Sequence, residues 1–323
     1  MSLRLHGDTL SRGDLLDFAV NVWPEPRSRS LGLALDAAVR STRYPDESRA
    51  REALAKRHGR APAEVLLLNG ACEGFWLLAH ALRPQRVAVV HPAFTEAEVA
   101  FAAAGARVTR VMREPATWTF DPGDVPADAD VVIVGSPNNP TGNVDAPETL
   151  RSLERAGRFV VVDGSFADFV PFDPESGVVL RSLTKLWSLA GIRAGYLLGP
   201  AELVERLAAN RQPWSVNAVA CAALEACAGD RDTPARVAEQ VAVQRDGLVA
   251  GLERLGVKTW PSVANFLLLE LDDGERVVAS LRERGIAVRP CSSFPGLDSR
   301  HVRIAVRTEA DNRVLLAALE DVL

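Results

Sequence analysis

Lysine is scarce in this 323-residue chain, which has three lysines within a combined Lys+Arg total of 37. Arginine can replace lysine as a surface charge but not in imine chemistry, because an ammonium can lose its proton and attack a carbonyl whereas a guanidinium cannot. Lys56 falls in a helix-like charged stretch at 48–58, and Lys258 falls in a polar turn at 256–260. These two positions indicate ordinary surface lysines.

Lys185 has a different setting. It follows the strand-like run 178–180, with Ser182 three residues before it and Arg193 eight residues after it. A lysine beside a hydroxyl and an arginine indicates a Schiff base next to a phosphate site. A chance surface lysine at the start of a helix fits the local pattern equally well, so the choice depends on the rest of the chain.

Cysteine and histidine are also few. Cys72, Cys221, Cys227 and Cys291 form no CxxC pair, and the five histidines are scattered, so a metal site has little support. Cys221 and Cys227 lie in an alanine-rich helical stretch, where we expect them to pack as small hydrophobes. A reduced, cytoplasmic setting fits this cysteine usage best.

Long apolar runs and excess positive charge are absent as well. No run reaches membrane-spanning length, and the first eight residues lack the apolar core of a signal peptide. The net charge of -5 gives no support for binding nucleic acid or an anionic membrane. We therefore expect a small-molecule substrate.

Short apolar runs alternate with helix-like segments from about residue 65 to 200, which is the pattern of an α/β fold with a largely parallel sheet. Five runs are typical of buried strands: 87–90, 131–134, 159–162, 178–180 and 196–198. Segments 75–82, 95–104 and 147–156 between them have the character of helices. After about residue 200 the chain is mainly helical, with strand-like runs at 266–271, 286–289 and 302–306.

Polar or aromatic residues follow four of these strands. Phe94 comes after the first, Asn139 after the second, Asp163 after the third and Lys185 after the fourth. Ligands of open α/β sheets bind beyond the carboxyl ends of the strands, so we expect these four side chains at one edge. A core phenylalanine and a capping aspartate are the alternatives for Phe94 and Asp163.

The length suits two domains. We expect a large domain at 31–229 and a smaller α+β domain made of residues 1–30 and 230–323.

The combined motifs resemble the aspartate-aminotransferase-type fold of pyridoxal 5'-phosphate (PLP) enzymes over nearly the whole chain. Within that fold the chain is similar to the branch that holds histidinol-phosphate aminotransferase and the threonine-phosphate decarboxylase of cobalamin biosynthesis. The resemblance implies a mostly parallel seven-stranded sheet, PLP as cofactor and a homodimer.

Cofactor contacts are implied by the same resemblance. Lys185 matches the lysine that carries PLP, and Asp163 the carboxylate that keeps the pyridine ring protonated as an electron sink. The matching phosphate, ring and oxygen contacts are Ala71, Cys72, Ser182, Arg193, Asn139, Phe94 and, reaching the partner subunit's cofactor, Tyr44.

Substrate contacts are implied in four places: His6, Asn21, Arg289 and Arg303. Arg303 matches the arginine that binds the α-carboxylate, for which a planar guanidinium is suited, although a surface arginine is the alternative. Arg289 resembles an arginine that contacts a substrate phosphate. Arg307 is a secondary candidate.

The details of the motifs favour the decarboxylase type. Phe166 stands three residues after Asp163, where typical aminotransferases have a tyrosine, and the opening His6-Gly7-Asp8 is similar to that of the decarboxylases. The expected reaction is therefore decarboxylation of a phosphorylated amino acid, O-phospho-L-threonine first, to aminopropanol phosphate. An aminotransferase acting on a substrate such as histidinol phosphate is the alternative, and a non-catalytic PLP-fold protein is the third.

Departures from the family pattern concern the substrate side. Gly164 and Ser165 replace the family's Glu-Ala, and Cys72 stands where a polar residue is common. Bulky Trp23 and acidic Glu25 are expected near the substrate entrance, where a carboxylate would repel a phosphate.

Overall fold

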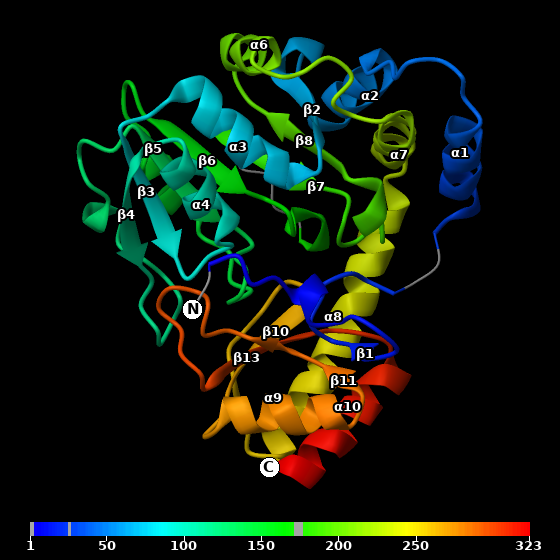
Figure 1. Ribbon diagram of the computed structural model, residues 1–323, viewed down its shortest axis with the longest axis vertical. Coiled ribbons are helices and arrows are strands. Elements are labelled where there is room, and N and C mark those ends of the chain that lie inside the picture. The colour runs from blue at the N-terminus through cyan, green and yellow to red at the C-terminus, as the bar shows by residue number, and fades with distance from the viewer. Residues whose placement is uncertain (1–2, 25–26, 171–176) are drawn as a thin grey trace.

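The computed structural model describes residues 3–24, 27–170 and 177–323 (Figure 1). A seven-stranded sheet has the order β2-β8-β7-β6-β5-β3-β4. All neighbouring strands are parallel except at β8, which runs antiparallel to β2 and β7. Its strands are β2 Val65–Asn69, β3 Arg86–His91, β4 Arg107–Met112, β5 Val131–Gly135, β6 Phe159–Asp163, β7 Val178–Ser182 and β8 Ala194–Leu198.

The five predicted apolar runs correspond to β3, β5, β6, β7 and β8. These strands are valine- and leucine-rich because helices cover both faces of the sheet, so both sides of each strand are buried. β4 was not predicted because it is the edge strand and lacks a continuous apolar run, with Arg107 and Arg110 among its exposed residues. β2 is buried and apolar but was not among the five runs.

Helices pack on both faces of this sheet (Figure 1). They are α1 Arg29–Val39, α2 Ser48–His58, α3 Ala71–Leu82, α4 Glu96–Ala103, α5 Pro147–Ser152, α6 Ala201–Ala209 and α7 Ala218–Gly229. One buried cluster lies between the sheet and helices α3, α4 and α6. Side-chain caps mark several helix starts, as where Ser28 accepts from the N–H of Leu31 and Asn217 from that of Ala220.

The C-terminal part contains a four-stranded antiparallel sheet of order β12-β13-β10-β9. Its elements are α8 Asp232–Arg254, β9 Lys258–Thr259, β10 Phe266–Glu270, α9 Gly274–Glu283, β11 Ile286–Ala287, β12 Arg289–Pro290, β13 His301–Ala305 and α10 Glu309–Val322. The single strand predicted at 286–289 is wrong, because the chain there forms two short strands in different sheets. Lys258 lies in β9 and not in a turn.

The N-terminal segment returns to this C-terminal part. Strand β1 Leu16–Asp17 pairs in parallel with β11. The long helix α8, yellow in Figure 1, runs from beside the large sheet to the small one.

The short 3₁₀ turns are Gly7–Thr9, Pro62–Glu64, Pro122–Asp124, Ala167–Phe169 and Ala190–Ile192. The domain boundaries at residues 30 and 230 stay a prediction.

Candidate active site

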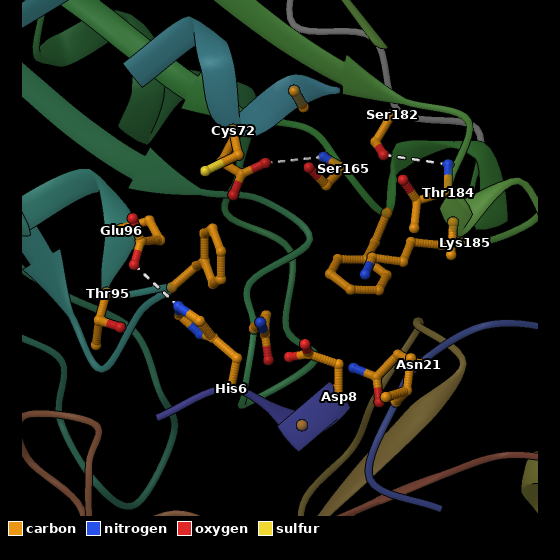
Figure 2. Close-up of a pocket in the computed structure, with 18 of the residues that line it drawn as sticks. His6, Asp8, Asn21, Cys72, Thr95, Glu96, Ser165, Ser182, Thr184 and Lys185 are labelled. Carbon is orange, nitrogen blue, oxygen red and sulfur yellow. Dashed lines mark hydrogen bonds and ion pairs between the residues drawn. The ribbon is translucent and has the colours of Figure 1, made fainter. Parts of the chain in front are cut away.

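A cavity of about 840 Å³ lies at the carboxyl ends of the central strands, between the large sheet, the small sheet and the N-terminal segment (Figure 2). It is lined by all but one of the predicted site residues: His6, Asn21, Ala71, Cys72, Phe94, Asn139, Asp163, Ser182, Lys185, Arg193, Arg289 and Arg303. The exception is Tyr44. The four side chains that follow β3, β5, β6 and β7 therefore meet at one edge, where the strand order placed them.

Lys185 lies in the loop after β7 and projects into this cavity (Figure 2). Burial, together with the nearby positive charges of Arg303 and Arg193, lowers the pKa of the Lys185 ammonium to about 8 against the opposite effect of Asp163. Its Nζ lies 5.7 Å from the centre of the Phe166 ring. An amine with this pKa is partly neutral near pH 7 and can act as a nucleophile or a proton carrier.

Asp163 ends β6, paired in register with Gly135 on one side and Leu180 on the other. Its Oδ1 accepts the backbone N–H of Ser165 at 3.1 Å. Burial raises the pKa of the Asp163 carboxyl above its usual range. The carboxylate is thus desolvated and forms no ion pair with a described side chain, which suits it to pair with a cationic ring nitrogen.

An anion cradle lies at the start of α3. Gly70 has φ +81°, and a Cβ there would lie 2.2 Å from Nη2 of Arg193, so this guanidinium rests directly on the glycine. A Cβ on Gly195 would lie 2.4 Å from the backbone nitrogen of Ala71. Ser182 also lines this end of the cavity, where its Oγ accepts the N–H of Thr184 at 3.2 Å. Helix N–H groups, a guanidinium and a hydroxyl together suit a phosphate.

Arg303, in β13, is 5% exposed and faces the other end of the cavity. Its Nη2 donates to the carbonyl of Ala19 at 2.7 Å, its Nη1 donates to Oδ1 of Asn139, and its Nε has no hydrogen-bond partner among the described residues. Burial lowers the pKa of the Arg303 guanidinium to about 10. The group therefore carries a charge that the protein compensates poorly.

Arg289, in β12, is the second buried guanidinium of this end, at 3% exposure. It donates to the carbonyls of Pro290 and Leu5 and to Oγ of Ser293. Burial lowers its pKa. Neither Arg289 nor Arg303 forms an ion pair with a carboxylate in the part of the chain that the structure describes.

The N-terminal segment contributes the predicted residue His6, which meets Glu96, a residue that the sequence did not single out. His6 Nε2 lies 2.9 Å from Oε1 of Glu96, the first residue of α4, and the His6 ring packs against Phe94 with centroids 5.6 Å apart. Arg4, Asp8, Trp76, Thr95, Glu96, Ser165, Phe166, Thr184 and Phe294 also line the cavity. Glu96 follows the predicted Phe94 by two residues, and that proximity was the one available signal.

Two residues expected near the substrate do not line the cavity. Trp23 is 3% exposed and packs in the core, with its backbone N–H donating to the carbonyl of Lys185 at 3.0 Å, so the expected position at the entrance is wrong. Arg307 donates to Asp17 and Asp311 and does not line the cavity. Glu25 lies outside the described residues.

Tyr44 does not reach the cavity of its own chain. Its ring is 76% exposed and stacks on Trp214, itself 60% exposed, with centroids 4.6 Å apart. The predicted contact with a partner subunit's cofactor stays a prediction.

Fold and cavity together define a PLP-dependent enzyme of the aspartate-aminotransferase-like fold, as the motifs predicted. The chain belongs to the family described as aminotransferase class I and II, whose model matches residues 9–319.

Similar proteins point to two activities. The chain is 42% identical to histidinol-phosphate aminotransferase Rv2231c of Mycobacterium tuberculosis (strain H37Rv), over 98% of this chain and 90% of that one. It is 33% identical to threonine-phosphate decarboxylase of Salmonella typhimurium (strain LT2), over 97% and 93%. In fold it matches histidinol-phosphate aminotransferase from Sinorhizobium meliloti, solved with pyridoxal 5'-phosphate, with a TM-score of 0.87 at 21% identity over 98% and 94%.

The residues present fit PLP. A Cβ at position 70 would displace the Arg193 guanidinium and one at position 195 would clash with the backbone nitrogen of Ala71, so both glycines keep the cradle intact, and Lys185 and Asp163 lie in the same cavity. Among the described helices, none combines the length and apolar character needed to cross a bilayer.

Proposed function

We propose that the protein is a PLP-dependent lyase that decarboxylates a phosphorylated amino acid, with O-phospho-L-threonine as the first candidate. The observation that carries this proposal is the pair of buried guanidiniums, Arg289 and Arg303, which lack carboxylate partners in the described structure. The cradle around Arg193 serves the cofactor's phosphate, so two further buried cations remain for the substrate. A carboxylate and a phosphate ester are the two anions that match them.

Each residue has a task in this proposal. Arg303 binds the α-carboxylate and Arg289 the phosphate, while Asn21 faces the same cavity with its Oδ1 buried and unpartnered among the described residues. When bound, the cofactor supplies an electron sink for the pair released as the bond to the carboxylate breaks. A proton must then replace carbon dioxide on the same carbon. Lys185 Nζ, with a pKa of about 8, can hold and return that proton.

The surroundings of Lys185 support decarboxylation over transamination. Phe166, 4% exposed, packs edge-on against Phe266 with centroids 5.0 Å apart and presents no hydroxyl to the cavity. The chain's two tyrosines lie elsewhere, since Tyr196 is buried with its hydroxyl 2.9 Å from His58 Nε2 and Tyr44 is exposed. The residues that one chain contributes thus lack the phenol that typical aminotransferases place near the lysine.

The second candidate is an aminotransferase acting on a phosphate-bearing amino compound such as histidinol phosphate. It is favoured by the 42% identity to the mycobacterial relative of that name. In this case Arg303 would bind the carboxylate of an amino donor.

A single-turnover experiment separates the two candidates. The PLP-loaded protein is mixed with O-phospho-L-threonine without any keto acid, and carbon dioxide, keto acid and cofactor absorption are followed together. Carbon dioxide with the original absorption restored is the expected result. Release of a keto acid without carbon dioxide would make the protein an aminotransferase and overturn the lyase proposal.

We also propose that the active form is a homodimer in which Tyr44 reaches the partner's cavity. The exposed Tyr44–Trp214 stack supports this, because two large aromatic rings at 76% and 60% exposure are costly to leave in water. Sedimentation at working concentration tests it, and a monomer with full activity would refute it.

A further inference from the structure

The N-terminal segment crosses the cavity and is tied to both of its sides. The carbonyl of Leu3 accepts from the Thr95 hydroxyl at the start of α4, and the carbonyl of Leu5 accepts from Arg289 of the small sheet. Between these two ties, His6 turns its ring into the cavity toward Glu96 (Figure 2). The position of His6 is therefore fixed by contacts on either side of it.

The pairing with Glu96 determines what His6 can offer a ligand. A carboxylate only accepts hydrogen bonds, so Nε2, at 2.9 Å from Glu96 Oε1, must carry a proton. Nδ1 has no partner among the described residues. It is a bare acceptor if the imidazole is neutral and a donor if the ring is an imidazolium, so an anionic ligand can bind Nδ1 only in the charged form.

Glu96 is placed to support that charged form. It is 8% exposed, so the attraction between its carboxylate and an imidazolium is weakly screened. The other charged or titratable groups near this pair are Arg4, whose Nε lies 3.9 Å from Oε1 of Glu96, and the cavity-lining Asp8, Cys72 and Arg289. Arg4 and Arg289 oppose a further positive charge at His6, whereas Glu96 and Asp8 favour it.

We propose that Glu96 is a positioning residue that determines specificity, because its contact with Nε2 orients the His6 ring so that Nδ1 can bind the phosphate of the substrate. The inference rests on the substrate class of the proposed function. It predicts that preference for a phosphorylated amino acid over its unphosphorylated counterpart depends on a carboxylate that itself never contacts the substrate.

The same helix provides a matched control. Glu98, two residues further along α4, is also 8% exposed and also lies 2.9 Å from a histidine, His91, but it does not line the cavity. Glu98→Gln removes the same charge from the same helix and breaks its histidine pair, together with the pair that Glu98 forms with Arg110. Any effect peculiar to Glu96→Gln therefore reports on the cavity and not on the helix.

The experiment measures a ratio of affinities. Binding of O-phospho-L-threonine and of L-threonine to the PLP-loaded protein is measured by calorimetry, together with KM and kcat where turnover occurs. The ratio of interest is the affinity for O-phospho-L-threonine divided by the affinity for L-threonine. Glu96→Gln is expected to lower this ratio roughly tenfold, which is the effect of one charge-assisted hydrogen bond, with little change in kcat. His6→Gln should lower it equally, and the double variant should lower it no further. Glu98→Gln should leave the ratio within about twofold.

The outcomes separate this inference from the proposed function. If the ratio survives Glu96→Gln, or falls equally in Glu98→Gln, the inference is overturned. A wild-type ratio near one overturns it too. If carbon dioxide is never released but the ratio behaves as described, decarboxylation fails while the role of Glu96 stands. Should Glu96→Gln not fold, the ratio measured for His6→Gln decides alone.

Discussion

Two buried arginines show how this protein separates structural from functional charge. Arg113 is 2% exposed and forms a two-pronged pair with Asp145, with Nη1 to Oδ1 at 2.7 Å and Nη2 to Oδ2 at 2.8 Å. It also donates to the carbonyls of Trp118 and Gly135. Arg303, at 5% exposure, donates to an amide oxygen and a backbone carbonyl and to no carboxylate in the described parts of the chain.

The difference lies in what neutralises each charge. A buried guanidinium is costly unless a carboxylate or another anion compensates it. Among the described residues, Arg113 has such an anion as its partner and Arg303 has none. The uncompensated cation marks the place where a ligand must bring its own negative charge, and the cavity at Lys185 is that place.

Among the variants that test this comparison, Lys185→Ala is expected to have the largest effect on turnover. Lys185→Ala should lower turnover by roughly three orders of magnitude or more, because no other described side chain in the cavity can bind the cofactor covalently. The free energy of unfolding of the cofactor-free protein should be unchanged or higher, since burial disfavours the ammonium.

Borohydride reduction followed by peptide mass mapping checks the same residue. The cofactor should be fixed to Lys185 in the wild type and to nothing in Lys185→Ala. Lys258→Ala, at an exposed surface pair, serves as the control. Cofactor found on Lys56 or Lys258 would contradict the assignment of the site.

The sequence correctly predicted that four side chains meet at one edge of the sheet, for a physical reason. Phe94, Asn139, Asp163 and Lys185 each follow a strand of one parallel sheet, and parallel strands deliver their carboxyl ends to one edge. Local order along the chain is then enough to predict proximity in space. The apolar, β-branched runs of those strands made the sheet itself visible.

The substrate side could not be predicted in the same way. Glu96 and His6 are ninety positions apart and meet only because the N-terminal segment folds back across the sheet edge. Trp23 shows the opposite error, since its position near the entrance was inferred from its place along the chain, whereas its large apolar ring is buried in the core. Long-range packing, absent from any local pattern, decides both positions.

Breaking the structural pair should produce the largest effect on stability. Asp145→Asn leaves Arg113 buried without a counter-charge and should lower the free energy of unfolding by about 3–5 kcal/mol, while turnover per folded molecule stays near wild type. Chemical denaturation measures it. Asp128→Asn, at the exposed pair with Arg86, should cost under about 1 kcal/mol. Equal losses in both would refute the distinction between the two pairs.

Arg303→Met should behave in the opposite manner to Asp145→Asn. Loss of the charged contact to the carboxylate is expected to raise KM by roughly 10- to 100-fold. The unliganded protein should be equally stable or more stable by about 1 kcal/mol, because an uncompensated buried charge is removed. Steady-state kinetics and denaturation of the same samples check both halves. If the variant loses stability without losing affinity, Arg303 has a structural role like that of Arg113.

The smallest expected effect concerns Glu98, which belongs with the structural charges although it lies beside Glu96. Burial alone would raise its pKa, but His91 and Arg110 outweigh it and lower the pKa to about 2 from a reference value of 4.5. A carboxylate with a lowered pKa stabilises the fold fully above the reference value, and this contribution is lost as pH falls toward 2. Glu98→Gln should therefore cost on the order of 2 kcal/mol near neutral pH, and its difference from wild type should shrink between about pH 4.5 and 2. Denaturation at several pH values measures that convergence. A difference that stays constant over this range would mean that Glu98 acts through packing, and the ion pair would then have no part in holding α4 in place.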